Sequence, residues 1–356
     1  MKPHHLLHCL ARARLCLGLA CLFLLGLGGV AQAQTRVAAD VQPRAVAPVP
    51  DADLGAWLSR VHEASRRRAY VGTFVVSAGG HMASARIWHV CDGAQQVERV
   101  ESLSGVPRST YRRNDQVMTY LPQSKVVVSE KRESLGLFPN LVMGDDAAVA
   151  QSYRLQPSGQ ERVAGFEADV VQLQAQDRLR FGYRVWTEKK TGLVVKLQTL
   201  DAGGRVLEQA AFSELQLDAP ISMVKLIQMM NRTQGYDVET PVLTKTTAAG
   251  EGWVFKSVVP GFSPVSCHNR AVSVEGAAGA DEAPASMMQC VFSDGLASVS
   301  LFVQGFDARR HAKTGVQAMG ATHTLTRRMG DWWLTAVGEV PTPTLMIFVQ
   351  GLERTR

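Results

Sequence analysis

The chain has 356 residues, 46% of them hydrophobic and 20% charged, and a net charge of +6. This length exceeds what one hydrophobic core usually organises, so two domains are expected. The positive charge is small for so long a chain, so a nucleic-acid partner is not expected.

The first 33 residues are typical of a secretory signal peptide. Basic residues at Lys2, Arg12 and Arg14 precede an apolar run over 15–27, and small residues stand at Ala31 and Ala33. The run is shorter than the roughly 20 residues that cross a bilayer, so cleavage before Gln34 is favoured over anchoring. The expected mature chain keeps 35 basic and 32 acidic residues, a net charge of +3, and three cysteines. We therefore expect it to work outside the cytoplasm.

After a Pro- and Ala-rich tail over 34–50, the sequence predicts a helix followed by strands. Asp51 or Asp53 can cap a helix in which Leu54, Trp57, Leu58 and Val61 recur at helical spacing. From Tyr70 the pattern alternates. We expect strands over 70–77, 85–89, 95–102, 109–114, 116–121 and 125–131.

The clearest strand signal is a meander over 178–217. Leu179, Phe181, Tyr183 and Val185 are expected on one face, with Arg180 and Arg184 on the other. Turns are predicted at 190–192 and 201–204. The first domain, 51–219, is therefore expected to be one large antiparallel sheet with a few helices.

A Met-rich amphipathic segment lies in the predicted linker, 220–241, before a second domain over 242–356. Such a segment is either core or partner surface. The second domain has expected strands over 253–259, 264–268, 288–292, 297–304, 322–329 and 332–339, and a final helix near Pro341 or Pro343. The fold class predicted for the whole chain is α+β.

Motifs of the common hydrolases, nucleotide-binding loops and zinc sites are absent from the sequence, so no enzyme activity, cofactor or metal is expected. The paired carboxylates Asp145/Asp146 and Asp281/Glu282 are interpreted as a helix start and a loop. Arginine runs such as 66–68 and 327–328 are either solvated faces or sites for anionic groups. Cys267 and Cys290 are near the ends of strands that a loop joins. They either form a disulfide, which is the favoured interpretation, or remain two separate thiols.

Several segments resemble the RseB/MucB family of periplasmic regulators of an extracytoplasmic-stress sigma factor, which implies that the mature chain is periplasmic. Within the meander these are 180–186, 190–193 and 206–209; elsewhere they are 70–75, 105–108, 120–122, 292–296 and 337–341. Together they follow the family's order over nearly the whole expected mature chain. Ser109, where an acidic residue is expected, and the pair Cys267/Cys290 depart from the family's pattern.

The resemblance implies a first domain like the lipoprotein carriers LolA and LolB, an unclosed antiparallel barrel with a concave apolar face, and a smaller α+β C-terminal domain. It implies binding to the periplasmic domain of an RseA/MucA-like anti-sigma factor and protection of that factor from site-one proteolysis. Lipopolysaccharide or lipoprotein acyl chains are expected to loosen this binding, and self-association into a homo-oligomer is compatible with the sequence. The alternatives are a lipid or lipoprotein carrier and an envelope hydrolase with a dispersed site.

Two sets of site residues follow. The residues expected to line or back the lipid cleft are Phe74, Val76, Ile87, Leu179, Phe181 and Tyr183. Apolar and aromatic anchors dominate interface energies, so the expected partner contacts are Met223, Leu226, Met230, Trp253, Trp332 and Trp333.

Overall fold

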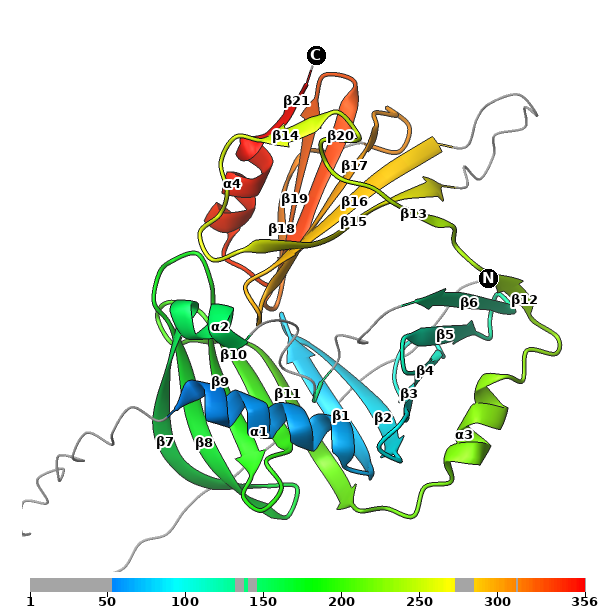
Figure 1. Ribbon diagram of the computed structural model, residues 1–356, viewed down its shortest axis with the longest axis vertical. Coiled ribbons are helices and arrows are strands. Elements are labelled where there is room, and N and C mark those ends of the chain that lie inside the picture. The colour runs from blue at the N-terminus through cyan, green and yellow to red at the C-terminus, as the bar shows by residue number, and fades with distance from the viewer. Residues whose placement is uncertain (1–52, 132–137, 140–145, 273–284, 312, 356) are drawn as a thin grey trace, which may run out of the picture. The chain divides into compact units, whose positions relative to one another are not determined.

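A computed structural model of the chain describes residues 53–131, 138–139, 146–272, 285–311 and 313–355 (Figure 1). The predicted signal peptide and tail, Asp145 and the pair Asp281/Glu282 lie outside these residues. Residues from Pro48 to Arg356 group into one compact unit, in which two large sheets are formed.

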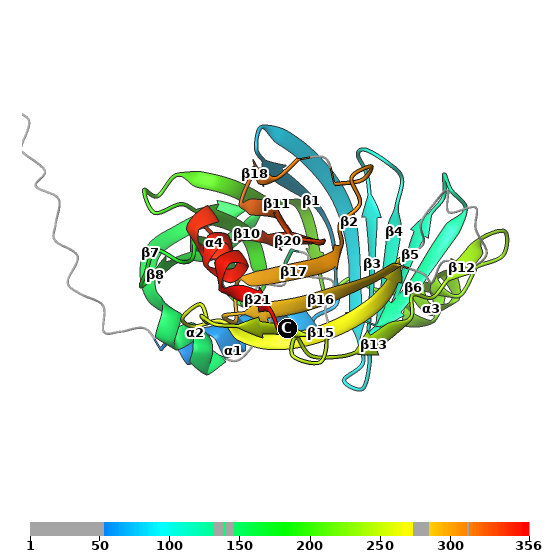
Figure 2. The same ribbon diagram turned by 90° about the horizontal axis from the view of Figure 1, so that it is seen from above.

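The first sheet has twelve strands and does not close, because its end strands β12 and β7 pair with one neighbour each. In spatial order its strands are β12 (Asp237–Glu239), β6 (Val126–Lys131), β5 (Gln116–Leu121), β4 (Ser109–Arg113), β3 (Gln96–Ser102), β2 (His81–Cys91), β1 (Tyr70–Ala78), β11 (Val206–Leu217), β10 (Val194–Leu200), β9 (Gly182–Glu188), β8 (Phe166–Ala175) and β7 (Tyr153–Val163). All pairs are antiparallel except β12–β6. The strong curvature of this sheet is visible in Figure 2. The predicted unclosed antiparallel sheet is confirmed.

Helices cover both faces of the first sheet. We call the face that carries Phe74 and Ile87 the inner face; α1 (Leu54–Arg67) packs there through Leu58 and Val61. The Asp53 carboxylate accepts a hydrogen bond from the Ala56 amide at 3.2 Å, which fixes the start of α1. The short helix α2 (Asp146–Ser152) leads into β7.

Part of the opposite, outer face, over β2 to β6, is covered by α3 (Met223–Met230), which follows the cap residue Ser222. Leu226 packs with Val90 and Val97, and Met230 packs with the tyrosines of β4 and β5. The predicted linker 220–241 therefore contains α3 and β12, both of which join the first sheet. The reason is local: Leu226 and Met230 stand four apart on one helical stripe, and burial of that stripe stabilises the helix.

The second sheet has seven antiparallel strands. In spatial order they are β13 (Leu243–Lys245), β15 (Ser263–Val272), β16 (Ala285–Ser293), β17 (Ser298–Gly305), β20 (Trp332–Gly338), β19 (Thr322–Met329) and β18 (Gly315–Met319). Helix α4 (Thr342–Gly351) packs on it, and β14 (Trp253–Phe255) pairs with β21 (Leu352–Arg354). The strand expected over 253–259 is thus only three residues long, since β21 offers only three partners.

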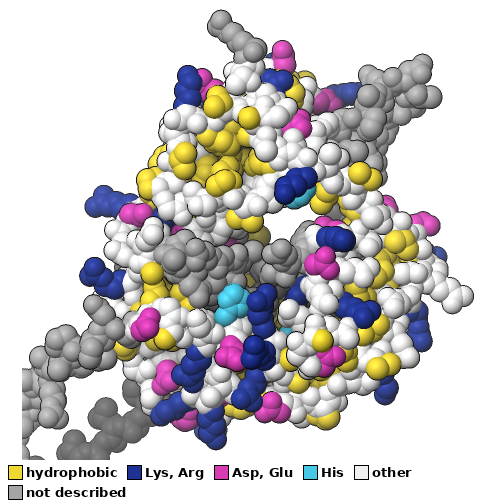
Figure 3. All heavy atoms as spheres, in the orientation of Figure 1, with side chains coloured by type: hydrophobic (Ala, Val, Ile, Leu, Met, Phe, Trp, Pro, Cys, Tyr) yellow, Lys and Arg dark blue, Asp and Glu magenta, His cyan; other side chains and the backbone are white. Residues whose placement is uncertain are grey.

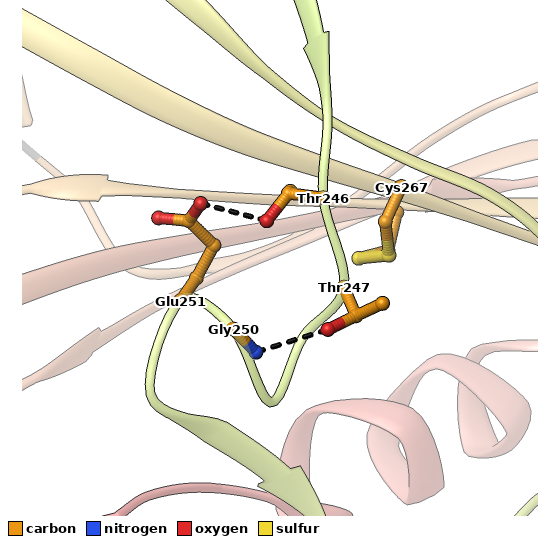
Figure 4. Close-up of a disulfide and its surroundings, with 6 residues drawn as sticks. Thr246, Thr247, Gly250, Glu251 and Cys267 are labelled. Atoms are coloured by element: carbon orange, nitrogen blue, oxygen red, sulfur yellow. Dashed lines mark hydrogen bonds between the residues drawn. A yellow bond between two sulfur atoms is a disulfide. The ribbon is translucent and has the colours of Figure 1, made fainter.

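A disulfide joins Cys267 and Cys290, which stand directly opposite each other on β15 and β16. Figure 4 shows the loop beside it, in which the Thr246 hydroxyl donates to the Glu251 carboxylate at 2.8 Å. The Gly250 amide donates to Thr247 Oγ1 at 3.0 Å. The disulfide therefore lies next to a hydrogen-bonded turn.

Candidate functional site

The inner face of the first sheet carries a continuous apolar cluster. Phe74, Ile87 and Tyr183 are buried members of it, and Val76 packs against it. The Phe74 ring lies 5.5 Å from that of Phe138 and 6.3 Å from that of Phe212, measured between centroids. Four of the six cleft residues predicted from the sequence thus lie together. In this conformation they are core, and their role as a ligand lining stays a prediction.

The other two predicted cleft residues, Leu179 and Phe181, contact the second domain. Leu179 packs against the core of that domain, and its carbonyl accepts a hydrogen bond from the Thr344 hydroxyl at 2.6 Å. The Phe181 ring meets the His323 ring edge-on, with centroids 5.6 Å apart. The strand predicted to include 179–185 begins only at Gly182, the first residue of β9. Leu179 and Phe181 therefore precede the strand and do not lie on its inner face.

Arg180, expected on the polar side of this strand, is the centre of a buried junction between the two sheets. Its Nε lies 3.3 Å from Asp294 Oδ2 in the turn between β16 and β17, close enough for an ion pair. Its Nη2 donates to the Pro260 carbonyl at 2.7 Å. The Tyr153 hydroxyl also donates to Asp294 Oδ2, at 3.0 Å. Because the side chains of Arg180 and Asp294 are 2% and 0% exposed, water screens this pair little.

The same turn of the second domain also contributes apolar contact. Leu296, two residues after Asp294, is a member of the inner-face cluster of the first domain. Asp294 Oδ1 accepts hydrogen bonds from the amides of Leu296 and Ala297 at 3.0 and 2.7 Å, which hold the turn in one shape. The turn therefore presents a carboxylate and an aliphatic side chain to the first domain at once.

A second contact between the sheets involves the turn between β18 and β19. A Cβ on Gly320 would lie 2.6 Å from the Ala78 Cβ and 2.9 Å from a Glu208 oxygen, so only glycine fits here. Gly320 also has φ of +61°, which favours glycine. The Ala321 amide donates to Glu208 Oε2 at 3.5 Å. Glu208 lies at the end of the inner face.

Burial shifts several titratable groups at these contacts. Desolvation raises the pKa of Asp294 above its usual value, although Arg180 and the two amides act against this. Desolvation likewise raises the pKa of the half-buried Glu208. It also raises the pKa of Tyr153 well above the usual value for tyrosine. Removal of these groups from water is the dominant cause in each case.

A row of polar residues crosses the inner face of β1 to β4. Tyr70, His89, Glu98 and Arg112 are opposite one another in successive strand pairs, and all are buried. Arg112 Nε donates to Glu98 Oε2 at 2.7 Å, and the rings of Tyr70 and His89 stack at 5.0 Å. His89 and Glu98 are each two residues from the paired Ile87 and Val100, so alternation places them on the same face. The sequence alone does not predict the row, because charged residues are not expected in a core.

Among the residues predicted to contact a partner, Leu226, Met230, Trp253 and Trp333 are buried within the chain. Met223 and Trp332 are partly buried against neighbouring residues. Partner contact through all six stays a prediction. In the segment from α3 to β13, the large apolar side chains that are exposed are Val224, Met229, Val238, Val242 and Leu243.

A polar hollow of about 660 Å³ lies beside the turn between β2 and β3. Arg66 and Arg67 of α1 line it, together with Gln95, Gln96 and Asn114. Arg67 also pairs with Glu63 at 2.9 Å, and Arg68 pairs with Asp218 at 3.1 Å. Figure 3 shows positive and negative side chains interspersed on the visible surface of the molecule. The arginine run is thus largely a solvated, ion-paired face.

The described residues contain no group of three or more His, Cys, Asp or Glu side chains arranged to hold a metal ion. They also include no helix long and apolar enough to span a membrane.

The fold and these surfaces define a two-domain protein in which a turn of the second domain is buried against an unclosed sheet. The family model for the MucB/RseB N-terminal domain matches residues 53–230, and that for the MucB/RseB C-terminal domain matches residues 247–353. The chain belongs to the MucB/RseB family. The resemblance inferred from the sequence is therefore confirmed.

Characterised relatives match over most of their length. The Sigma factor AlgU regulatory protein MucB of Pseudomonas aeruginosa is 27% identical over 84% of this chain and 90% of its own. The Sigma-E factor regulatory protein RseB of Escherichia coli K12 is 23% identical over 84% of this chain and 90% of its own. These relatives are regulatory proteins by name.

Solved structures show the same fold. A crystal structure of MucB in complex with MucA(peri) matches with a TM-score of 0.62 and 24% identity, over 85% of this chain and 100% of that chain. The MucA/MucB complex of Pseudomonas aeruginosa matches with a TM-score of 0.64 and 23% identity, over 86% of this chain and 100% of that chain. The mainly antiparallel two-domain fold is thus shared with MucB.

Proposed function

We propose that this protein is a periplasmic regulator that binds the periplasmic domain of a membrane anti-sigma factor and protects it from site-one proteolysis. The observation that carries the proposal is the match of both family domains, in order, along one chain. The relatives are named regulators of sigma factors, and the two solved structures described above are complexes of MucB with MucA. Protection requires only that the extended target be occupied, so the proposal needs no catalytic residue.

We propose that the partner contacts the second domain and the segment from α3 to β13. The buried anchors Leu226 and Met230 hold α3 in place, while Val224 and Met229 lie on its exposed side, 64% and 37% exposed. Further exposed apolar side chains follow along the chain up to Leu243, and exposed apolar surface marks interaction sites. Lipid or lipoprotein acyl chains are proposed to act through the inner face of the first domain.

Titration of the periplasmic anti-sigma segment with the full mature chain tests the contact. Val224→Asp and Met229→Asp should each weaken binding about tenfold or more, because each places a charge in an apolar contact. Met82→Asp is the matched control, since Met82 is 73% exposed and lies on the first sheet away from α3. If the full chain does not bind the segment, the proposed function is wrong. If binding occurs but neither α3 variant changes it, only the contact surface is wrong.

A further inference from the structure

The turn between β16 and β17 enters the first domain as a ligand would. Its Asp294 carboxylate meets Arg180 and the Tyr153 hydroxyl, while Leu296 joins the apolar cluster two residues later. Arg180 and Tyr153 belong to the first domain and Asp294 to the second. The first domain thus offers a cationic and hydrogen-bonding site, with apolar side chains beside it, to a carboxylate carried by an aliphatic chain.

The receiving site is built and largely dry. The second domain contributes to it, because the Pro260 carbonyl accepts a hydrogen bond from Arg180 at 2.7 Å and the Phe262 ring centroid lies 5.3 Å from the guanidinium. The ring centroid of Tyr153, in the first domain, lies 5.9 Å from it. The partly exposed Asp177 lies 3.5 Å from it. Asp294 is the fully buried carboxylate that faces it. A planar guanidinium fixed in this way recognises carboxylate and phosphate groups through paired hydrogen bonds.

We propose that this site binds the head group of an anionic amphiphile, and that Asp294 and Leu296 occupy it as an internal substitute that the amphiphile displaces. The inference deepens the proposed function and rests on it, because it names the site through which an amphiphile would act on the regulator. Displacement would free the turn between β16 and β17 and so loosen the contact between the two sheets.

The apolar surface beside the site is longer than a leucine side chain. Tyr183, Leu197, Phe212 and Phe74 follow one another on the inner face of β9, β10, β11 and β1, all in or against the same cluster. Four neighbouring strands span about 14 Å at ~4.8 Å per step. This extent suits an acyl chain better than a peptide turn, and Phe138 already covers its far end.

An internal substitute lowers the apparent affinity of a competing ligand, because the ligand binds only the fraction of molecules whose site is open. Weakening the substitute should therefore strengthen ligand binding. This opposite effect separates competition from a merely structural role of the turn, in which weakening the turn would leave ligand affinity unchanged or lower it.

The test titrates the full mature chain with monomeric dodecyl phosphate and with uncharged monolaurin. Asp294→Asn retains an oxygen for the Leu296 and Ala297 amides but removes the charge, so dodecyl phosphate should bind about tenfold more tightly than to wild type. Asp307→Asn is the matched control, since Asp307 also accepts a hydrogen bond from a backbone amide, that of Arg309, in a turn of the second domain. Unchanged or weaker binding by Asp294→Asn would overturn the proposal.

The double variant Arg180→Met/Asp294→Asn avoids a lone buried charge and tests the head-group site itself. It should bind both amphiphiles with similar affinity, whereas the Arg184→Met control, in the strand β9 that follows Arg180, should keep the wild-type preference for dodecyl phosphate. A double variant that still prefers dodecyl phosphate would contradict the assignment of Arg180.

Hydrogen exchange supplies a readout of displacement. Saturating dodecyl phosphate should increase amide exchange over residues 293–297 in the wild type, because the amides of 296 and 297 are protected only while the turn is docked and ordered. Unchanged exchange in this segment at saturation would overturn the competition. No anti-sigma segment is present in these measurements, so their failure is distinct from failure of the partner-binding proposal.

Discussion

The two faces of the first sheet are covered in different ways. Part of the outer face, over β2 to β6, is covered by α3, which follows the long strand β11 along the chain and contributes apolar side chains such as Leu226. Part of the inner face is covered by the Asp294 turn, which comes from the other sheet and is held by a buried ion pair. Apolar burial stabilises without a partner of fixed geometry, whereas a buried charge requires its partner. The inner cover is thus the one that a charged ligand can replace.

The largest expected effect comes from breaking the ion pair on one side. Arg180→Met should lower the free energy of unfolding by about 3–5 kcal/mol, because it leaves the Asp294 carboxylate buried without its cation. Denaturant titration measures this loss. Arg180→Met/Asp294→Asn should recover at least half of it, since no lone charge remains. A double variant as unstable as the single one would show that the pair matters through packing and not through charge.

Removal of the disulfide tests how much it stabilises the second domain, which supplies the Asp294 turn. Cys267→Ala/Cys290→Ala removes a cross-link between residues 23 positions apart in the chain. It should lower the free energy of unfolding by about 3 kcal/mol. Cys91→Ala is the matched control, because Cys91 is the free cysteine among the described residues. It should change the free energy by about 0.5 kcal/mol or less. Equal losses for the two variants would contradict a stabilising role for this disulfide.

The outer cover should respond as ordinary core. Leu226→Ala should cost about 2–3 kcal/mol, through lost apolar burial and the cavity that remains. Val224→Ala, on the exposed side of α3, should stay within about 0.5 kcal/mol of wild type. Unlike the inner cover, this loss should be the same with and without amphiphile. A loss that depends on amphiphile would remove the distinction between the two faces.

The smallest expected effect concerns pH at the end of the inner face. Burial raises the pKa of Glu208 in the folded chain, and Glu339 has a raised pKa through burial and the charge of Glu208. A carboxyl whose folded pKa is raised contributes stability below its unfolded pKa and loses it as pH rises through the folded value. Glu208→Gln should therefore stabilise the chain at pH 7 and have little effect near pH 4. Denaturant titration at both values checks this; an equal effect at both would contradict it.

Much of the fold could be predicted because strand and turn signals are local. The strands 116–121 and 322–329 were predicted with the bounds of β5 and β19, and the helix after Asp53 follows from its cap and apolar spacing. The positions of Leu179, Phe181 and Arg180 could not be read from alternation, since their environment is formed by residues such as His323 and Asp294, more than 100 positions away. The sequence places Asp294 only between the predicted strands 288–292 and 297–304, because nothing in Ser293-Asp294-Gly295 shows what this turn contacts.

The most direct test of the central claim is the cleavage rate of the periplasmic anti-sigma segment by its site-one protease. Saturating full-length mature protein should slow cleavage, because the bound segment is not accessible to the protease, and dodecyl phosphate should restore the rate. Asp294→Asn should need less dodecyl phosphate for this restoration than the wild type. A cleavage rate that the saturating protein leaves unchanged would contradict the regulatory function proposed for this chain.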